Sequence, residues 1–166
     1  MRFQLPDLGS PDGQLEFVIG IIANQAVRAE SAWRVAAGLR DRLGHLDGDR
    51  LAAMPESRLA SIIAQRPALH PFAAAMGRYI TGTCRMLCDD YDGTVSALWS
   101  DGPRATALIT RLTALPGIGR HKAEVALYLL AREYGIAVTE DRPLDAALSH
   151  CPRLRDVFGP PDSPPP

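Results

Sequence analysis

The chain has 166 residues, of which 46% are hydrophobic and 6% aromatic, so it is long enough for one domain with a sizeable core. Its 18 lysines and arginines against 19 aspartates and glutamates leave a net charge of −1, which excludes a polycation that coats nucleic acid without specificity. Three cysteines without a Cys-X-X-Cys motif indicate a reduced cytoplasmic setting, and no apolar run is long enough to cross a bilayer.

The first part of the chain predicts an irregular lead-in followed by a buried helix. Residues 1–13 carry two prolines and two glycines, which favour a loop. From Gln14 to Gln25 the sequence is apolar nearly all round, which predicts a central helix buried on every side. Apolar spacing with Gly and Pro boundaries predicts further helices at 28–43, 50–53, 56–65, 72–91, 95–99 and 103–115.

A tight connection follows the helix predicted at 103–115. The sequence Leu-Pro-Gly-Ile-Gly ends that helix, and a second helix starts at once at Arg120. Two glycines around a β-branched apolar residue predict a hairpin that exposes backbone N–H groups. These groups lie at a helix N-terminus, where the helix dipole favours an anion, so the stretch predicts a phosphate site made of backbone.

The remaining residues predict a core helix, a last helix and a tail. An apolar stretch at 120–134 ends at Gly135, residues 136–139 are expected to be extended, and Asp141 opens a helix that reaches His150. The proline-rich tail 151–166 is predicted to stay outside the core. We therefore predict an all-α fold with no sheet, in which residues 14–150 form one compact helical domain.

The order of these features resembles the helix-hairpin-helix (HhH-GPD) superfamily of DNA glycosylases, of the endonuclease III type. The hairpin at 113–121, the early helix that ends in Gln25 and the stretch 83–93 match elements of the family, and the resemblance covers about 14–150. It implies a compact multi-helix fold and N-glycosylase activity in base excision repair. The partner would be double-stranded DNA with a damaged or mispaired base, which the family flips into a pocket because the bond to be cut is hidden in the stack.

The resemblance also implies how DNA would be held. The family's hairpin grips one phosphate through backbone N–H groups and so fixes the register on the strand. The matching groups here are the backbone of Gly117, Gly119 and His121, with the side chain of Arg120. In the family a monovalent cation, K⁺ or Na⁺, is bound by hairpin carbonyls and assists this grip. The matching carbonyls are those of Thr113, Leu115 and Ile118.

The family's chemical step uses a carboxylate that stabilises the positive charge on the sugar or activates water. Asp141 is the best match to this carboxylate. The local pattern is one or two residues longer than in the family, so Glu140 and Asp145 are alternatives. Asp141 is equally expected to be a helix cap.

Lyase-type members carry a Schiff-base lysine at the position of His121. The lysine here is the next residue, Lys122, which a turn of about 100° would direct away from the pocket, toward solvent or a phosphate. A hydrolytic enzyme with His121 in its pocket wall is therefore implied.

Residues 66–71, before the long middle helix, form an unusual break in which two prolines flank an apolar residue and a histidine. In the family this loop inserts an apolar wedge into the gap left by the flipped base. Phe72 lies nearest that position, with Leu69 and His70 beside it, and Gln25 would approach from the other side. A core position for Phe72 is the alternative.

Many members of the family also hold an iron–sulfur cluster through four cysteines near the C-terminus. This sequence lacks those cysteines, so a reduced second domain without a cluster is expected.

Three functions stay open at this point. The first is a monofunctional DNA glycosylase, the second a DNA-binding protein that has lost catalysis, and the third a related enzyme for a specialised modified base. A carboxylate that faces His121 across a base-sized pocket favours an enzyme, whereas a filled pocket favours the binding protein. A monomer in the cytoplasm is expected, associated with the nucleoid if the source is a bacterium.

Overall fold

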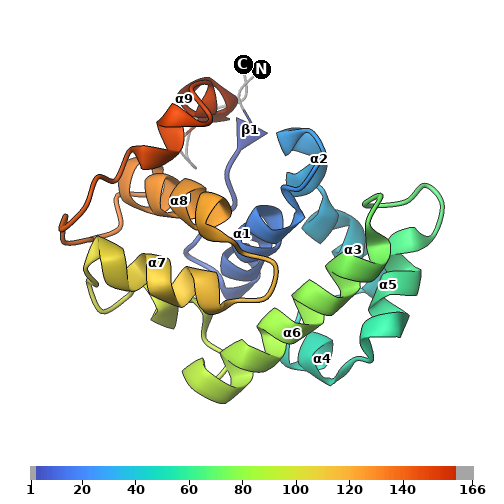
Figure 1. The fold of residues 1–166 in the computed structure, drawn as a ribbon. Coiled ribbons are helices and arrows are strands. Elements are labelled where there is room, and N and C mark those ends of the chain that lie inside the picture. The colour runs from blue at the N-terminus through green and yellow to red at the C-terminus, as the bar shows by residue number, and fades with distance from the viewer. Residues whose placement is uncertain (1–2, 160–166) are drawn as a thin grey trace.

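The computed structural model describes residues 3–159, and its helices surround one central helix (Figure 1). This helix, α1 (Pro11–Ala23), contacts α2 (Ala29–Trp33), α3 (Val35–Leu43), α6 (Ala73–Tyr91) and α8 (Arg120–Tyr128). Every residue of α1 from Phe17 to Ala23 is buried. The predicted all-α architecture, with its first helix in the middle of the core, is confirmed.

The start of α1 (Pro11–Ala23) lies three residues before the predicted position at Gln14. Ser10 is the N-cap, and its Oγ accepts a hydrogen bond from the Gly13 backbone N–H at 3.0 Å. Pro11 occupies the first helical position, where its fixed φ fits the helix and its missing N–H costs nothing. The proline that suggested a loop is therefore part of a helix start.

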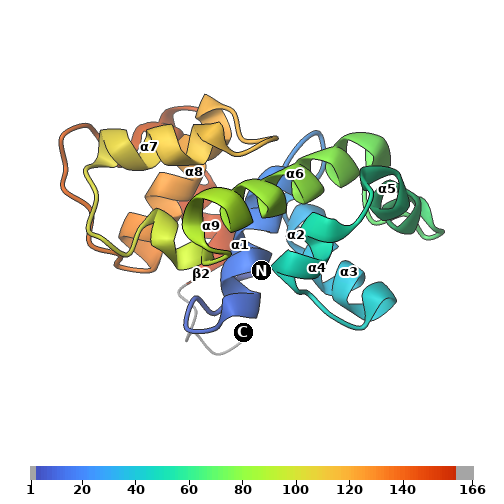
Figure 2. The same ribbon diagram turned by 90° about the horizontal axis from the view of Figure 1, so that it is seen from below.

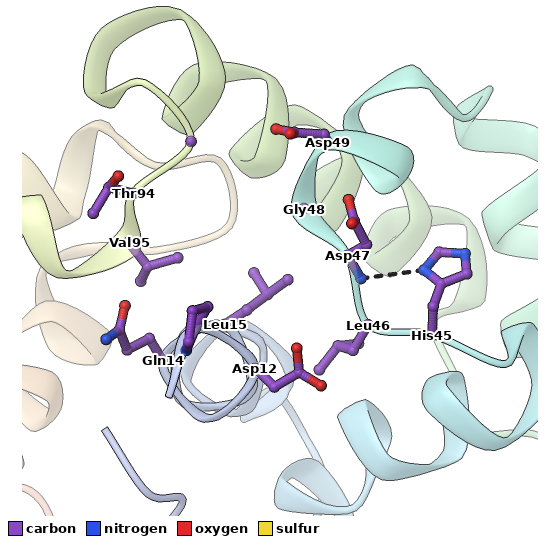
Figure 3. A pocket seen from close by; sticks show the side chains of 12 residues that line it. Asp12, Gln14, Leu15, His45, Leu46, Asp47, Gly48, Asp49, Thr94 and Val95 are labelled. Carbon is purple, nitrogen blue, oxygen red and sulfur yellow. Dashed lines mark hydrogen bonds between the residues drawn. The ribbon is translucent and has the colours of Figure 1, made fainter. Parts of the chain in front are cut away.

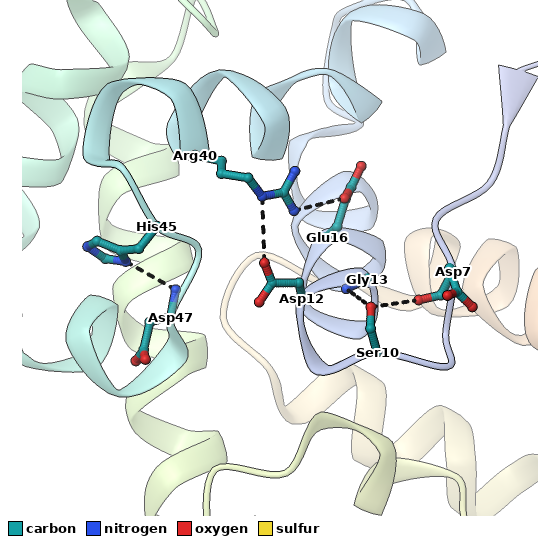
Figure 4. A network of polar contacts seen from close by, with 8 residues as sticks. All are labelled: Asp7, Ser10, Asp12, Gly13, Glu16, Arg40, His45 and Asp47. Carbon is teal, nitrogen blue, oxygen red and sulfur yellow. Dashed lines mark hydrogen bonds and ion pairs between the residues drawn. The ribbon is translucent and has the colours of Figure 1, made fainter.

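The helix predicted at 28–43 is divided into α2 and α3, which meet at Arg34. The side chain of Arg40 on α3 then ties this part of the chain to the start of α1 (Figure 4). Its guanidinium lies 3.7 Å from the carboxylate of Asp12 and 3.1 Å from that of Glu16. The divided helix thus packs on α1 through both apolar and charged side chains.

The middle helices form two groups on opposite sides of α1 (Figure 2). On one side α4 (Gly48–Ala53) and α5 (Glu56–Ala64) pack against α6. On the other side α7 (Ala105–Ala114) packs against α8, and η1 (Val95–Leu98) connects α6 to α7. The predicted and observed boundaries of α4, α5, α6, η1 and α7 differ by two residues at most, whereas α8 ends at Tyr128, six residues before the predicted end at Tyr134.

The last part of the helical domain departs from the prediction. After α8 the chain continues as a π-helical turn, η2 (Leu129–Glu133), but no helix opens at Asp141, and η3 (Ala146–Ser149) is only a short 3₁₀ turn. The backbone of Thr139 explains the difference, because its N–H donates to the Pro103 carbonyl and its carbonyl accepts from the Ala105 N–H, both at 2.9 Å. The chain after Thr139 is therefore held against the start of α7.

The two ends of the described chain correct the prediction that there is no sheet. β1 (Phe3–Gln4) and β2 (Phe158–Gly159) pair in parallel, and α9 (Leu154–Val157) comes directly before β2. Leu154 is buried, so the first part of the predicted tail joins the core. Residues 160–166 of that tail lie outside the described residues. Between residues 3 and 159, no helix is both long and apolar enough to span a membrane.

Candidate nucleic-acid interface

The hairpin at 113–121 joins α7 to α8 through a tight turn. The N–H of Ile118 donates to the carbonyl of Leu115 at 3.1 Å. Gly117 has a φ of +84°, and a Cβ built there would lie 2.7 Å from ring atoms of Tyr79 on α6. Both the backbone conformation and the contact with Tyr79 therefore require glycine at this position.

Gly119 is under neither constraint. Its φ of −82° and ψ of −179° describe extended backbone that any residue adopts, and a Cβ there would meet no atom within 4 Å. The first amide of α8 that is bonded within the helix is that of Ala123, which donates to the Gly119 carbonyl at 2.9 Å. Within residues 3–159, no acceptor meets the amides of Gly119, Arg120 and His121. The helix N-terminus is thus open, with no side chain above its first glycine.

The start of α7, in contrast, is closed by a carboxylate from elsewhere in the chain. Asp141 Oδ1 accepts a hydrogen bond from the Thr106 N–H at 3.0 Å, and its Oδ2 accepts one from the Thr106 hydroxyl. These bonds from Thr106 hold the pKa of Asp141 below its usual value. Asp141 is therefore a cap, but of α7 rather than of the segment that follows it.

A groove of about 570 Å³ runs beside the hairpin. Its lining consists of Asn24, Gln25, Tyr79, residues 113–119, His121 and Lys122. The structure thus brings together Gln25, His121 and the hairpin residues Thr113, Leu115 and Ile118, which the sequence predicts from distant parts of the chain. No carboxylate belongs to this lining, all of which lies in the described part of the chain. Asp141 bonds to Thr106, while Glu140 and Asp145 lie 4.0 and 3.0 Å from the guanidinium of Arg132.

The position of Lys122 corrects the prediction that it points away from the groove toward solvent or a phosphate. Its Nζ donates to the carbonyl of Ile22 at 2.7 Å, to that of Gly117 at 2.9 Å and to Gln25 Oε1 at 3.3 Å. Burial lowers the pKa of Lys122, whereas three oxygen acceptors favour its ammonium form. All three ammonium hydrogens are used, so Lys122 ties the hairpin to the end of α1.

Arg120 is the cation that remains exposed next to the open amides, with 78% of its side chain accessible. It pairs with Glu124, one turn further along α8, at 3.3 Å. Glu124 is buried and lies 2.8 Å from Arg142, and the hydrogen bonds from Arg142 and Arg120 hold the pKa of its carboxyl below the usual value. Glu124 is not singled out by the sequence analysis. The signal that could have found it is its spacing, because an acidic residue four positions after an arginine on a helix is typical of an ion pair.

In the loop before α6, the side chain of Phe72 is exposed, whereas those of Leu69 and His70 pack against the rest of the protein. His70 is only 2% exposed, its Nε2 donates to the Ala23 carbonyl at 2.9 Å, and its Nδ1 accepts from the Phe72 N–H at 3.0 Å. Leu69 packs on Gly38 of α3. The prediction that His70 contacts DNA is therefore wrong, because its ring anchors the loop to the end of α1. Phe72 is 46% exposed and is the large hydrophobic side chain that residues 3–159 leave open to solvent.

The anchoring by His70 predicts a loss of stability in mild acid. Burial lowers the pKa of His70 from its usual value of 6.5, so the folded protein disfavours the imidazolium form. The contribution of neutral His70 is then fully present above about pH 6.5 and is lost as the pH falls toward the folded-state pKa, by at most about 1.4 kcal/mol per pH unit. Urea unfolding of the wild type and of His70→Asn across this range measures the difference, which should shrink as the pH falls. A constant difference would contradict this assignment.

A second pocket, of about 450 Å³, lies between the starts of α1 and α4 (Figure 3). Its lining includes the carboxylates of Asp12, Asp47 and Asp49. Asp47 Oδ1 caps α4 by accepting from the Arg50 N–H at 2.9 Å. The negative charge of this pocket repels a phosphate, so the groove beside the hairpin is the better candidate for DNA. No group of three side chains suited to a metal ion occurs within residues 3–159.

The fold is similar to that of solved structures, although the sequence itself has no match. No protein-family model matches the sequence, and no curated protein matches it either. A non-covalent endonuclease III–DNA complex matches with a TM-score of 0.52 and 21% identity over 76% of this chain and 49% of that chain. A trapped endonuclease III–DNA covalent intermediate, an estranged-adenine complex, matches with a TM-score of 0.50 and 19% identity over 76% and 57%. The chain thus spans about half the length of these neighbours. Its fold is that of endonuclease III, with the helix-hairpin-helix between α7 and α8.

Proposed function

We propose that this protein binds double-stranded DNA through the hairpin at 113–121. The observation that carries the proposal is the open start of α8, where Gly119 leaves space above three amides that have no acceptor. A DNA phosphate supplies the anion that such a helix start favours, and the exposed guanidinium of Arg120 adds a positive charge beside it. A monovalent cation at the carbonyls of Thr113, Leu115 and Ile118 is part of the same proposal.

The surroundings of the hairpin support action on a single damaged or mispaired base. Phe72 is exposed on a loop that His70 anchors to the end of α1, and Gln25 at that end lines the groove. In this proposal Phe72 fills the gap in the stack while the base enters the groove, and Gln25 approaches the DNA beside it. Unstacking costs a few kcal/mol, which the phosphate contacts offset.

For the chemical step we propose hydrolysis of the N-glycosidic bond without a lyase step. Asp141 is the proposed carboxylate, and His121 forms part of the pocket wall. Because Asp141 is bonded to Thr106 in the structure, this step requires the loop after Thr139 to move when DNA binds. The second candidate function is DNA binding without catalysis, and the lack of a carboxylate in the groove lining favours it.

The experiment that separates these functions is base release from a panel of duplexes. The panel carries uracil, mispaired thymine, and oxidised, alkylated and otherwise modified bases, and each duplex is incubated with the wild type and with Asp141→Asn. Glu140→Gln and Asp145→Asn serve as matched variants, because both carboxylates lie on the same loop against Arg132. Release that Asp141→Asn abolishes supports the enzyme. Release that survives Asp141→Asn refutes the assignment of Asp141, and binding without release across the panel supports the second candidate.

We also expect that borohydride will trap no covalent adduct between this protein and abasic DNA. A Schiff base needs a free neutral amine, and the ammonium of Lys122 is held by three oxygen acceptors. Gel electrophoresis after reduction measures the adduct, with a lyase-type glycosylase as the positive control. An adduct that disappears in Lys122→Met would show that the held lysine is released on DNA binding.

A further inference from the structure

A thiol and two imidazoles meet beside the first turn of α8. The Sγ of Cys151 lies 3.9 Å from His121 Nε2, which is hydrogen-bonding distance for sulfur. The ring of His121 contacts that of His150 edge to face, with centroids 5.5 Å apart and an interplanar angle of 84°. The functions proposed above use His121 only as part of the pocket wall and leave Cys151 without a role.

The backbone holds Cys151 in this place. Its N–H donates to the Ala147 carbonyl at 2.8 Å, and its carbonyl accepts from the Leu154 N–H at 3.0 Å. Leu154 is in turn buried in the core. Cys151 therefore belongs to a fixed turn between η3 and α9, and its contact with His121 is part of the fold.

The other two thiols of the chain have different surroundings. Cys84 is buried, and burial raises its pKa to about 12. Cys88 is partly exposed, as Cys151 is, but burial and a hydrogen bond to the Asp49 carboxylate raise its pKa. Cys151 instead faces an imidazole nitrogen, which can accept a thiol proton.

We propose that Cys151 is a reactive thiol, with His121 as its base, that forms mixed disulfides with low-molecular-weight disulfides. His121 Nε2 takes the thiol proton, and the thiolate attacks one sulfur of the disulfide. A new S–S bond forms at Cys151 while the original S–S bond breaks, and the departing thiolate takes up the proton. Because His121 also lines the groove beside the hairpin, the adduct lies at the edge of the proposed DNA site and shields it.

The test of the thiol is the rate at which the native protein reacts with an aromatic disulfide whose released thiolate is coloured. We expect a fast phase that Cys151→Ser removes and that Cys88→Ser leaves unchanged. His121→Gln should slow this phase at least about tenfold, because an amide cannot take up the proton. His150→Gln is the matched control and should retain the fast phase. A fast phase that survives Cys151→Ser, or an unchanged rate in His121→Gln, overturns the proposal.

The effect on DNA rests on the proposed function and is measured separately. After treatment with the same reagent, the wild type should bind duplex DNA at least about tenfold more weakly, and a reductant should restore binding. Cys151→Ser should keep its affinity through the same treatment. Equal losses in both proteins contradict shielding by the adduct. If the untreated protein does not bind DNA, the proposed function fails, while the reaction rates still decide the role of the Cys151 thiol.

Discussion

Replacing Gly119 with alanine is expected to leave the fold intact and to weaken DNA binding by about tenfold to a hundredfold. A methyl group at this position meets no atom of the protein, and the backbone is already extended, so the free energy of unfolding should change by less than about 1 kcal/mol. The same methyl group occupies the space through which a phosphate reaches the open amides. Hydrogen bonds to a charged group contribute about 1.5–3 kcal/mol, which sets the expected loss of affinity.

Substitutions at two other glycines serve as comparisons for Gly119→Ala. Gly117→Ala should lose stability, by about 1–3 kcal/mol, because it combines a positive φ with a contact against Tyr79. Gly48→Ala is the matched control, since a Cβ there meets only Leu15 at 3.9 Å and lies in the acidic pocket. Thermal unfolding and titration of labelled duplex DNA measure both quantities for each variant. If Gly119→Ala binds DNA as tightly as Gly48→Ala does, the backbone of the hairpin is not the phosphate site.

Replacing Lys122 with methionine is expected to destabilise the protein by about 1–3 kcal/mol and to loosen the groove. Methionine keeps most of the length of the side chain but removes the donor that joins the carbonyls of Ile22 and Gly117 to Gln25. The hairpin then loses its direct tie to the end of α1. DNA affinity should fall as well, because the amides of the hairpin and Gln25 are no longer held in one arrangement.

Arg120→Met is the matched control for Lys122→Met, because the two residues lie two positions apart on the first turn of α8. Arg120 is mostly exposed, and its partner Glu124 keeps Arg142, so little stability should be lost. DNA affinity should fall for all sequences alike, and the dependence of log affinity on log salt should flatten by about one unit. Chemical denaturation and DNA titration at several salt concentrations separate the two variants. Equal stability losses would show that Lys122 does not tie the hairpin to α1.

The local signals in the sequence were sufficient for the helices and the hairpin. Helix α1 and the hairpin both form through interactions between residues close together in the sequence. The apolar run therefore predicts the helix, and the positions of the two glycines predict the hairpin. The start of α1 was misplaced because Pro11 is typical of loops and of the first helical position alike, and only the cap by Ser10 decides between them.

The roles of individual site residues depend on contacts between distant segments, which spacing along one helix does not encode. The sequence predicts that Lys122 turns away from the groove, because His121 matches the position of the Schiff-base lysine in lyase-type glycosylases. The long side chain of Lys122 instead reaches Ile22, one hundred residues earlier in the chain. The sequence predicts Asp141 as a cap or a catalytic group. That it caps α7 follows only from the pairing of Thr139 with the residues around the start of α7.

In the proposed function, the open amides at the start of α8 bind a DNA phosphate. The most direct measurement is the change in backbone amide resonances by NMR when a short duplex is added to the protein. We expect the largest changes at the amides of Gly119, Arg120 and His121, and we expect these changes to vanish at high salt. Changes that leave these amides unaffected and concentrate on another surface of the protein would contradict it.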